Sequence, residues 1–354
     1  MLSAQTSLPP ETIAKRNELY RRLDTVAATP LWNVMARLVT PQPQPLSAPG
    51  KWEYDRMREL LLEAGELITA KEAERRVLIL ENTGLRGMSQ ITQSLYAGLQ
   101  MILPGEIAPS HRHAASALRF VLEGEGGYTA VDGERIFMEV GDFIITPSWT
   151  FHDHGNHGKE PVIWLDGLDV PIVNLFDTSF AQSYPGEQQA ISRPEGDARA
   201  RYGSGLLPIE HVAGGSSSPV FHYPYKVAKA SLDALLCAGT VDAWHGVKLQ
   251  YVNPLNGDYA MPTMAAYLQL LPRDFASLPY RSTDSMVFCV KDGQGESIVG
   301  EQVISWKRGD VFVVPSWSTV THRTEGEAVL FSFSDRAAQK KLGLWREEKE
   351  GTSS

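Results

Sequence analysis

The chain has 354 residues, of which 43% are hydrophobic and 21% charged, and its formal net charge is −9. It is long enough for two ordinary domains. No apolar run approaches the roughly 20 residues of a membrane helix, and the first residues lack the apolar stretch of a secretory signal. We therefore expect no membrane association. The acidic balance also argues against nucleic acid as a partner, because that role needs a basic face.

The cysteine content points to a compartment. The chain has two cysteines, Cys237 and Cys289, which cannot form a disulfide framework. Because such proteins are typical of reducing surroundings, we expect a cytoplasmic protein.

The first 75 residues are predicted to form a helical region. Pro9 and Pro10 precede Glu11, and proline suits the first turn of a helix. Between residues 57 and 68, apolar side chains recur three, four and seven positions apart, which is the spacing of one helix face.

From residue 76 onward the pattern changes to short apolar runs separated by turn residues. Those in 76–185 are LYAGLQMIL, LRFVL, YTAV, RIFMEV, DFIIT and VIWL, and Asp132-Gly133 predicts a tight hairpin turn. Many short strands with such turns indicate a β-sandwich or barrel. Residues 186–250 are predicted to be a linker with a helix, 251–340 a second β-domain, and 341–354 a frayed tail.

The second set of strands repeats the first. An offset of 169 residues relates Leu99-Gln100 to Leu268-Gln269, and Gly124-Glu125-Gly126 to Gly293-Gln294-Gly295. An offset of 168 relates Gly141-Asp142 to Gly309-Asp310, and Pro147-Ser148-Trp149 to Pro315-Ser316-Trp317. An offset constant to one residue over four landmarks indicates duplication of one β-domain.

Histidines are concentrated in the first β-domain, where five of the nine fall between positions 111 and 157. His111 and His113 are two residues apart, so on a β-strand both imidazoles point to the same face. His152 follows a strand and a turn, and it is the candidate for a third ligand from a distant segment. The sequence therefore predicts a metal site of three histidines.

The spacing around these histidines resembles the two motifs of the cupin family. The matching residues are Gly105, His111, His113 and Gly126 for the first motif, and Gly141, Pro147, His152 and Asn156 for the second, with Trp149 replacing a glycine. The usual cupin glutamate should fall at 117 or 118, which are Ala117 and Leu118. The resemblance implies an all-β bicupin, two tandem double-stranded β-helix barrels, with a metal on three neutral imidazoles.

The ligand set constrains the chemistry without fixing the metal. Three ligands on one face of an octahedron leave three positions open, as in non-haem iron oxygenases, although imidazole also suits Zn, Ni and Cu. A divalent ion on neutral ligands keeps its full charge, which one substrate's carboxylate and phenolate would neutralise as a chelate. We hypothesise an Fe(II) enzyme that brings an aromatic hydroxy-carboxylate and O2 together, with electron density from the ring activating the oxygen.

Two charged or titratable side chains are expected near the metal. Strand parity from His111 carries Arg119 inward, with its two-pronged carboxylate geometry, if the strand runs without a bulge; a bulge would turn it outward. His154, two residues beyond His152, is either an acid or base near neutral pH or a loop histidine.

Three further residues have open interpretations. Trp164 and Asp166 share parity on one strand, and the carboxylate either orients a histidine or caps a strand end. Gln100 alternates with Gly98 and Ile102, and it is either a substrate contact or a packed amide.

Beyond the cupin motifs, the chain resembles the bicupin ring-cleaving dioxygenases that act on gentisate, salicylate or 1-hydroxy-2-naphthoate. The resemblance rests on ERRVLILEN at 74–82, HRHAASALRFVLEGEG at 111–126, GDFIITPSWTFHDHGN at 141–156 and the repeated PSW at 315–317. It implies Fe(II)-dependent cleavage of gentisate to maleylpyruvate in aromatic catabolism, and a homotetramer.

The same resemblance implies roles around the metal. We assign the metal to His111, His113 and His152, catalysis to His154 and Asp166, and substrate binding to Arg75, Gln100, Arg119 and Trp164. Arg75 has an alternative as a surface partner of Glu72 or Glu74.

The second β-domain has lost every ligand position. The offsets map His111 to Tyr280, His113 to Ser282, His152 to Val320 and Arg119 to Phe288, while His322 corresponds to His154. We therefore expect one iron per chain, with the second barrel serving packing or assembly.

Other functions stay open. A cupin isomerase of sugar phosphates would use Zn or Mn and no O2, and the missing glutamate weighs against it. A non-catalytic cupin, for storage or sensing, would usually lack the three ligands or carry a DNA-binding helix. Among dioxygenases, salicylate and 1-hydroxy-2-naphthoate are alternatives to gentisate, because no candidate residue reads the gentisate 5-hydroxyl unambiguously.

Overall fold

The computed structural model describes residues 8–211 and 215–351; the parts of the predicted N-terminal region, linker and tail at 1–7, 212–214 and 352–354 lie outside the described residues. The chain divides into two units, Met1–Gln44 and Pro45–Ser354. The first contains α1 (Pro10–Asp24) and α2 (Leu31–Leu38), neither of which buries a side chain. Within the described ranges, no helix is long and apolar enough to cross a membrane.

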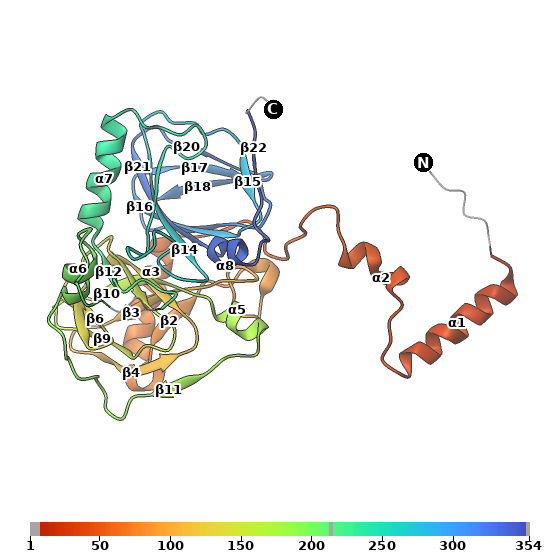
Figure 1. Ribbon diagram of the computed structural model, residues 1–354, viewed down its shortest axis with the longest axis horizontal. Coiled ribbons are helices and arrows are strands. Elements are labelled where there is room, and N and C mark those ends of the chain that lie inside the picture. Colours follow the sequence, from red (N-terminus) through yellow and green to blue (C-terminus); the bar gives the residue numbers. More distant parts are fainter. Residues whose placement is uncertain (1–7, 212–214, 352–354) are drawn as a thin grey trace. The chain divides into compact units, whose positions relative to one another are not determined.

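The first barrel consists of a six-stranded sheet, β12-β8-β5-β10-β3-β2, and a five-stranded sheet, β11-β4-β9-β6-β7 (Figure 1). Its strands are β2 (Arg76–Ile79), β3 (Tyr96–Ile102), β4 (Ile107–His113), β5 (Ala117–Glu123), β6 (Gly127–Val131), β7 (Glu134–Phe137), β8 (Phe143–Thr146), β9 (His152–Asn156), β10 (Val162–Leu168), β11 (Ala181–Ser183) and β12 (His222–Tyr223). Short helices join them: α4 (Ala70–Ala73), η1 (Thr83–Leu85), α5 (Val170–Leu175) and α6 (Asp197–Tyr202).

The second barrel has the same construction, with sheets β1-β19-β16-β21-β14-β13 and β18-β17-β20-β15-β22. Its strands are β1 (Gly50–Trp52), β13 (Val247–Gln250), β14 (Ala265–Leu271), β15 (Tyr280–Ser282), β16 (Met286–Asp292), β17 (Gln294–Val299), β18 (Gln302–Lys307), β19 (Val311–Val314), β20 (Val320–Arg323), β21 (Ala328–Ser334) and β22 (Glu347–Lys349). Its helices are α3 (Tyr54–Leu67), α7 (Tyr225–Cys237) and α8 (Arg336–Lys341).

The predicted duplication is confirmed by strand order, register and backbone conformation. His111 pairs with His152 in the first barrel, and their counterparts Tyr280 and Val320 pair in the second. Trp149 and its counterpart Trp317 both have positive φ angles, 60° and 61°, at equivalent turns. The helical character predicted for the N-terminal residues is also confirmed, by α1 to α4.

The segment before each barrel crosses to the other barrel. β1 adds to β19 of the second barrel, and α3 then packs on β2 and β3 of the first. β12 adds to β8 of the first barrel, and α7 then packs on β13 and β14 of the second. Both helices begin in the same way: the backbone N–H of Tyr54 donates to Asp310, and that of Tyr225 donates to Asp142, each at 2.9 Å.

The barrels share one apolar core, formed where their six-stranded sheets face each other. The rings of Phe120 and Phe331 stack at a centroid distance of 4.2 Å with an interplanar angle of 5°. Phe143 lies 5.6 Å from the Phe331 ring, and all three side chains are buried. This interface makes the second barrel part of the support for the first.

The expectation of a frayed tail at 341–354 is wrong for its middle part. Glu347–Lys349 form β22, which pairs with β15 and completes the second five-stranded sheet as β11 does in the first. The segment lacks alternating apolar residues, because its edge position is held by backbone pairing and by polar contacts such as Tyr280 Oη to Glu347 at 3.0 Å. Nothing in its composition distinguishes it from a solvated end.

Replacing Phe331 with alanine tests the shared core. Phe331→Ala should lower the free energy of unfolding by roughly 3–5 kcal/mol, because it leaves a cavity between the two sheets. Urea unfolding followed by circular dichroism measures the change. The matched control is Phe176→Ala, whose side chain is 58% exposed; equal effects of the two substitutions would contradict a core shared by the barrels.

Candidate metal centre

Three histidines of the first barrel meet as the sequence predicts. His111 and His113 lie on β4 and His152 begins β9, the strand paired with β4. One ring nitrogen from each lies within 4.8 Å of the others, and this is the group of potential metal ligands found within the described part of the chain. A single ion can contact all three nitrogens from that position.

Backbone carbonyls fix the orientation of these rings. His113 Nδ1 lies 2.7 Å from the carbonyl oxygen of Ala115, and His152 Nδ1 lies 3.0 Å from that of Thr150. His111 also has a backbone hydrogen bond, with Pro109. A carbonyl oxygen only accepts, so each Nδ1 carries the proton and each Nε2 keeps its lone pair. The residues thus fit a divalent metal ion.

Burial keeps these imidazoles neutral. It lowers the pKa of His111 to about 3, and it lowers the pKa of His152 well below the ordinary value near 6.5. Positive charge from Arg75 and Arg119 acts in the same direction on His111. Because metal ligands must be unprotonated, the site is ready to bind at neutral pH.

Arg119 points inward, although the strand predicted to carry it there is interrupted. β4 ends at His113 and β5 begins at Ala117 in the other sheet, so strand parity does not connect the two positions. The buried guanidinium donates from Nη1 to Thr146 Oγ1 at 2.7 Å and lies with Nη2 3.2 Å from His154 Nε2. The chain bends at 114–116, where the Ser116 N–H donates to Asp169 at 2.7 Å.

His154 is a buried side chain held by this arginine, not a loop histidine. A guanidinium only donates, so His154 Nε2 accepts and Nδ1 carries the proton. Burial, together with the charge of Arg119, lowers the pKa of His154 well below its ordinary value. Nδ1 has no hydrogen-bond partner among the described residues, so a buried N–H group is left to donate.

Trp164 and Asp166 contact each other instead of orienting a metal-binding histidine. Trp164 Nε1 donates to Asp166 at 2.9 Å, and Asp166 lies 3.7 Å from Arg119 Nε. In the described ranges no histidine bonds to Asp166, so the suggestion that it orients one is not supported. Burial raises the pKa of Asp166 to about 6 despite the nearby arginine. The Trp164 and His154 rings lie 5.4 Å apart.

Arg75 and Gln100 line one small cavity beside the site. Arg75 Nη2 donates to the Pro109 carbonyl at 2.8 Å, and no ion pair with Glu72 or Glu74 occurs among the described side chains. Burial and the charge of Arg119 lower the pKa of Arg75 to about 10. Gln100 is 3% exposed. The surface-partner interpretation of Arg75 is therefore not supported by its contacts.

Two residues near the site were not singled out from the sequence. Thr146 accepts from Arg119, and Tyr96 lies close enough to Asp166 for that carboxylate to raise its pKa, together with burial. Tyr96 shares its strand face with Gly98 and Gln100, so period-two alternation could have identified it. Thr146 ends an otherwise apolar strand, and that position was the available signal.

Comparison with known proteins gives a consistent picture. Residues 98–169 match the family model described as a cupin domain. The chain is 55% identical over 340 residues to gentisate 1,2 dioxygenase 1 of Aquipseudomonas alcaligenes, covering 96% of this chain and 98% of that protein. It is 36% identical to 5-aminosalicylate 1,2-dioxygenase of Comamonas sp, covering 90% and 86%. A crystal structure of salicylate 1,2-dioxygenase from Pseudoaminobacter salicylatoxidans with gentisate superimposes with a TM-score of 0.91 at 32% identity, covering 99% and 97%.

Removing one ligand should abolish metal binding. His113→Ala should weaken binding of a divalent metal by more than the roughly 10–100-fold that loss of an outer partner costs. Elemental analysis after metal loading and gel filtration should find one metal per chain in the unaltered protein and in His157→Ala, a control at an exposed histidine. Two tightly bound metals per chain, or full occupancy in His113→Ala, would contradict the site.

Proposed function

The chain belongs to the gentisate 1,2-dioxygenase family of bicupin ring-cleaving enzymes and is a dioxygenase, and we propose that it opens gentisate with O2 to give maleylpyruvate. The ring would break between the carbons that bear the carboxyl group and the adjacent hydroxyl. The observation that carries the substrate class is the charge of the pocket. Three neutral imidazoles and two arginines surround a metal position that has one buried carboxylate nearby.

One Fe(II) per chain, held by the Nε2 atoms of His111, His113 and His152, is the proposed cofactor. When bound, it would supply a Lewis-acidic centre with open positions where substrate oxygens and O2 can meet. Support comes from the facing lone pairs and from the family membership. The second barrel has Tyr280, Ser282 and Val320 at the corresponding positions, which is why we propose a single iron.

The two arginines favour an anionic substrate. Arg119 and Arg75 both raise the positive potential at His111, and Arg119 spends part of its fork on Thr146 and His154. Arg75 has a backbone carbonyl as its printed hydrogen-bond acceptor, so most of its N–H groups are available. We propose that Arg75, with Gln100 beside it, binds the substrate carboxylate, while Arg119 holds His154.

Within this site His154 acts as a hydrogen-bond donor. Its Nε2 lone pair is occupied by Arg119, so it cannot remove a proton without losing that contact. Its Nδ1–H is free to stabilise negative charge on a substrate oxygen. Asp166, with a pKa of about 6, is the group nearby that can gain or lose a proton near neutral pH. Trp164 would contribute by holding Asp166 and packing on His154.

Two aspects of the proposal rest on weaker support. The homotetramer follows from the family resemblance alone. The cytoplasmic location agrees with the described cysteines, Cys237 and Cys289, both being free thiols.

The substrate assay separates the candidate functions. The protein, loaded with Fe(II) without oxygen, should consume O2 and form a ring-opened product fastest with gentisate, compared with salicylate and 1-hydroxy-2-naphthoate. Oxygen-electrode and ultraviolet measurements under air and argon follow the reaction. Higher kcat/KM for salicylate would move the substrate to that acid, and inactivity on all three would contradict the proposal.

Arg75→Met tests the substrate-binding role. Loss of its charge-assisted hydrogen bonds should lower kcat/KM for gentisate by about 10–100-fold, mostly through KM. Arg75→Lys should recover only part of this, because it lacks the planar fork. Arg86→Met is the control, since Arg86 is exposed and pairs with Glu81 at 3.0 Å. An unchanged KM in Arg75→Met would rule out this role.

A further inference from the structure

The second barrel contains a pocket at the position that the metal centre occupies in the first. Its walls include Tyr280, Ser282 and Val320, the counterparts of the three ligands, and His322, the counterpart of His154. About 20 Å³ of free space remains, room for about one water-sized group. The duplicated fold has therefore kept a small polar pocket here after losing the metal ligands.

A lysine without a carboxylate partner lies in this pocket. Lys248 on β13 forms its printed hydrogen bond to the Met286 sulfur at 3.7 Å, a weak acceptor. Its Nζ lies 4.8 Å from the Tyr267 ring centre and 5.8 Å from that of Phe288, the residue at the Arg119 position. No described carboxylate comes within ion-pairing distance of Lys248. Aromatic faces alone therefore surround this ammonium group.

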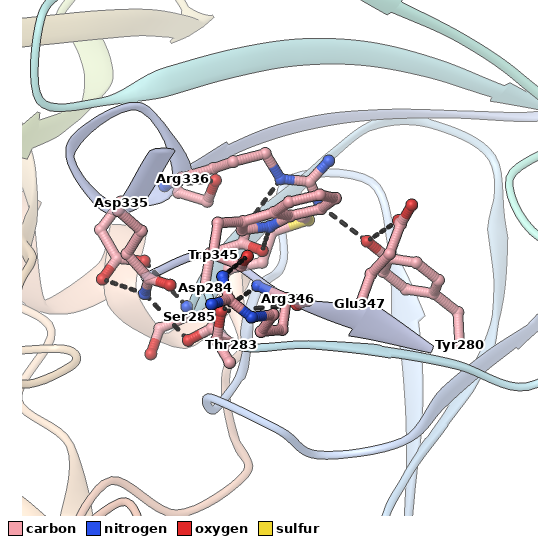
Figure 2. Close-up of polar contacts among 12 residues, drawn as sticks. Tyr280, Thr283, Asp284, Ser285, Asp335, Arg336, Trp345, Arg346 and Glu347 are labelled. Atoms are coloured by element: carbon pink, nitrogen blue, oxygen red, sulfur yellow. Dashed lines mark hydrogen bonds and ion pairs between the residues drawn. The ribbon is translucent and has the colours of Figure 1, made fainter. Parts of the chain in front are cut away.

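The neighbouring charges already have partners, as Figure 2 shows. Asp284 accepts from Arg336 Nε at 3.2 Å and from Trp345 Nε1 at 2.8 Å. Arg336 Nη2 also donates to Tyr280 Oη at 2.8 Å, and that hydroxyl donates to Glu347. This network balances its own charges, so Lys248 leaves the pocket with one uncompensated positive charge.

Two neutral imidazoles add hydrogen-bond donors. Trp306 Nε1 donates to Ser297 Oγ at 2.8 Å, and Ser297 Oγ lies 2.8 Å from His322 Nδ1. With Trp306 as donor, the serine hydroxyl gives its proton to Nδ1, so the His322 Nε2 atom carries an N–H. His245, which also lines the pocket, packs edge-on against the Tyr280 ring at 4.6 Å. Its ring makes no hydrogen bond to another described residue.

We propose that the second barrel binds a small carboxylate in this pocket, with Lys248 as the counter-ion and the N–H groups of His322 and His245 as donors. One uncompensated charge matches a monoanion, and the narrow space admits a head group such as formate in preference to a phosphate or a whole aromatic ring. The site is independent of the metal and differs from the packing role expected for this barrel.

Protonation of Lys248 sets the pH range of binding. Burial and the Arg336 charge lower its pKa to about 7. The groups around it are Asp242, His245, Tyr267, Tyr280, Asp284, His322 and Arg336. Burial lowers the pKa of His245 to about 2 and that of His322 to about 3, and it raises the pKa of Tyr280 to about 12. Since these groups keep their charge between pH 6 and 9, Lys248 alone titrates, and affinity falls as it loses its proton above pH 7.

Titration with sodium formate at constant ionic strength tests the site. The fluorescence of Trp244, which lines the pocket, and calorimetry report binding by the iron-loaded protein. Saturable binding should weaken about 90-fold from pH 6 to pH 9, the ratio set by a pKa near 7. His113→Ala, which disables the first barrel, should keep this binding. Acetate and salicylate, tested in the same variant, distinguish a free small acid from an aromatic acid as the source of the carboxylate.

Substitution of the lysine decides the outcome. Lys248→Met should weaken formate binding at pH 6 by at least about 10-fold, while Lys226→Met, at an exposed lysine of α7, should bind as the unaltered protein does. His322→Phe gives a second test that retains the lysine and should also weaken binding. Absence of saturable binding, or binding that survives both Lys248→Met and His322→Phe, would overturn the proposal.

Discussion

The site depends on carbonyl groups of the chain that hold the Nδ1 protons of three buried histidines. This constraint leaves three Nε2 lone pairs directed at one point in surroundings that oppose protonation. It is a local property of β4 and β9: for His113 and His152 the accepting carbonyls lie two residues away along the chain. The nearby arginines then add positive charge that the protein does not fully balance. A chelating aromatic acid supplies the missing negative charge, and the proposed substrate class follows from this imbalance.

The duplicated barrel shows how one framework accommodates different chemistry. The two halves share strand order, register and even the positive φ at Trp149 and Trp317. Their apolar sheets are joined through the Phe120–Phe331 stack, so the second barrel could change its polar interior without loss of its structural role. Where the first barrel has ligands and Arg119, the second has Tyr280, Ser282, Val320 and Phe288, with Lys248 as the charge in the pocket.

Sequence reasoning identified the features that are encoded locally. The His-x-His spacing, the turn residues and the offsets of 168 and 169 were sufficient for the two barrels and the histidine cluster, because period-two strands and glycine turns depend on neighbouring residues. It did not identify β22, whose strand is fixed by an edge partner from another part of the chain. It also joined β4 to β5 through strand parity, whereas the bend at 114–116 depends on Asp169, a residue more than 50 positions away.

Long-range contacts also explain the revised roles of single residues. Arg119 was expected inward as a free fork, and its inward position is found, but its bonds to Thr146 and His154 come from strands that no spacing rule links to it. Asp166 was expected to serve a histidine, and its partners are Trp164 and Arg119. Lys248 looked unexceptional in the sequence because its significance lies in the absence of a nearby carboxylate in the folded barrel.

A single-turnover experiment with isotopically labelled oxygen tests the central claim most directly. Protein with one Fe(II) per chain is mixed with gentisate and a limiting amount of 18O2, and the products are examined by mass spectrometry. The account predicts one ring-opened product per O2 consumed, with both labelled atoms in the product. A product carrying no label, or consumption of O2 without ring opening, would contradict it.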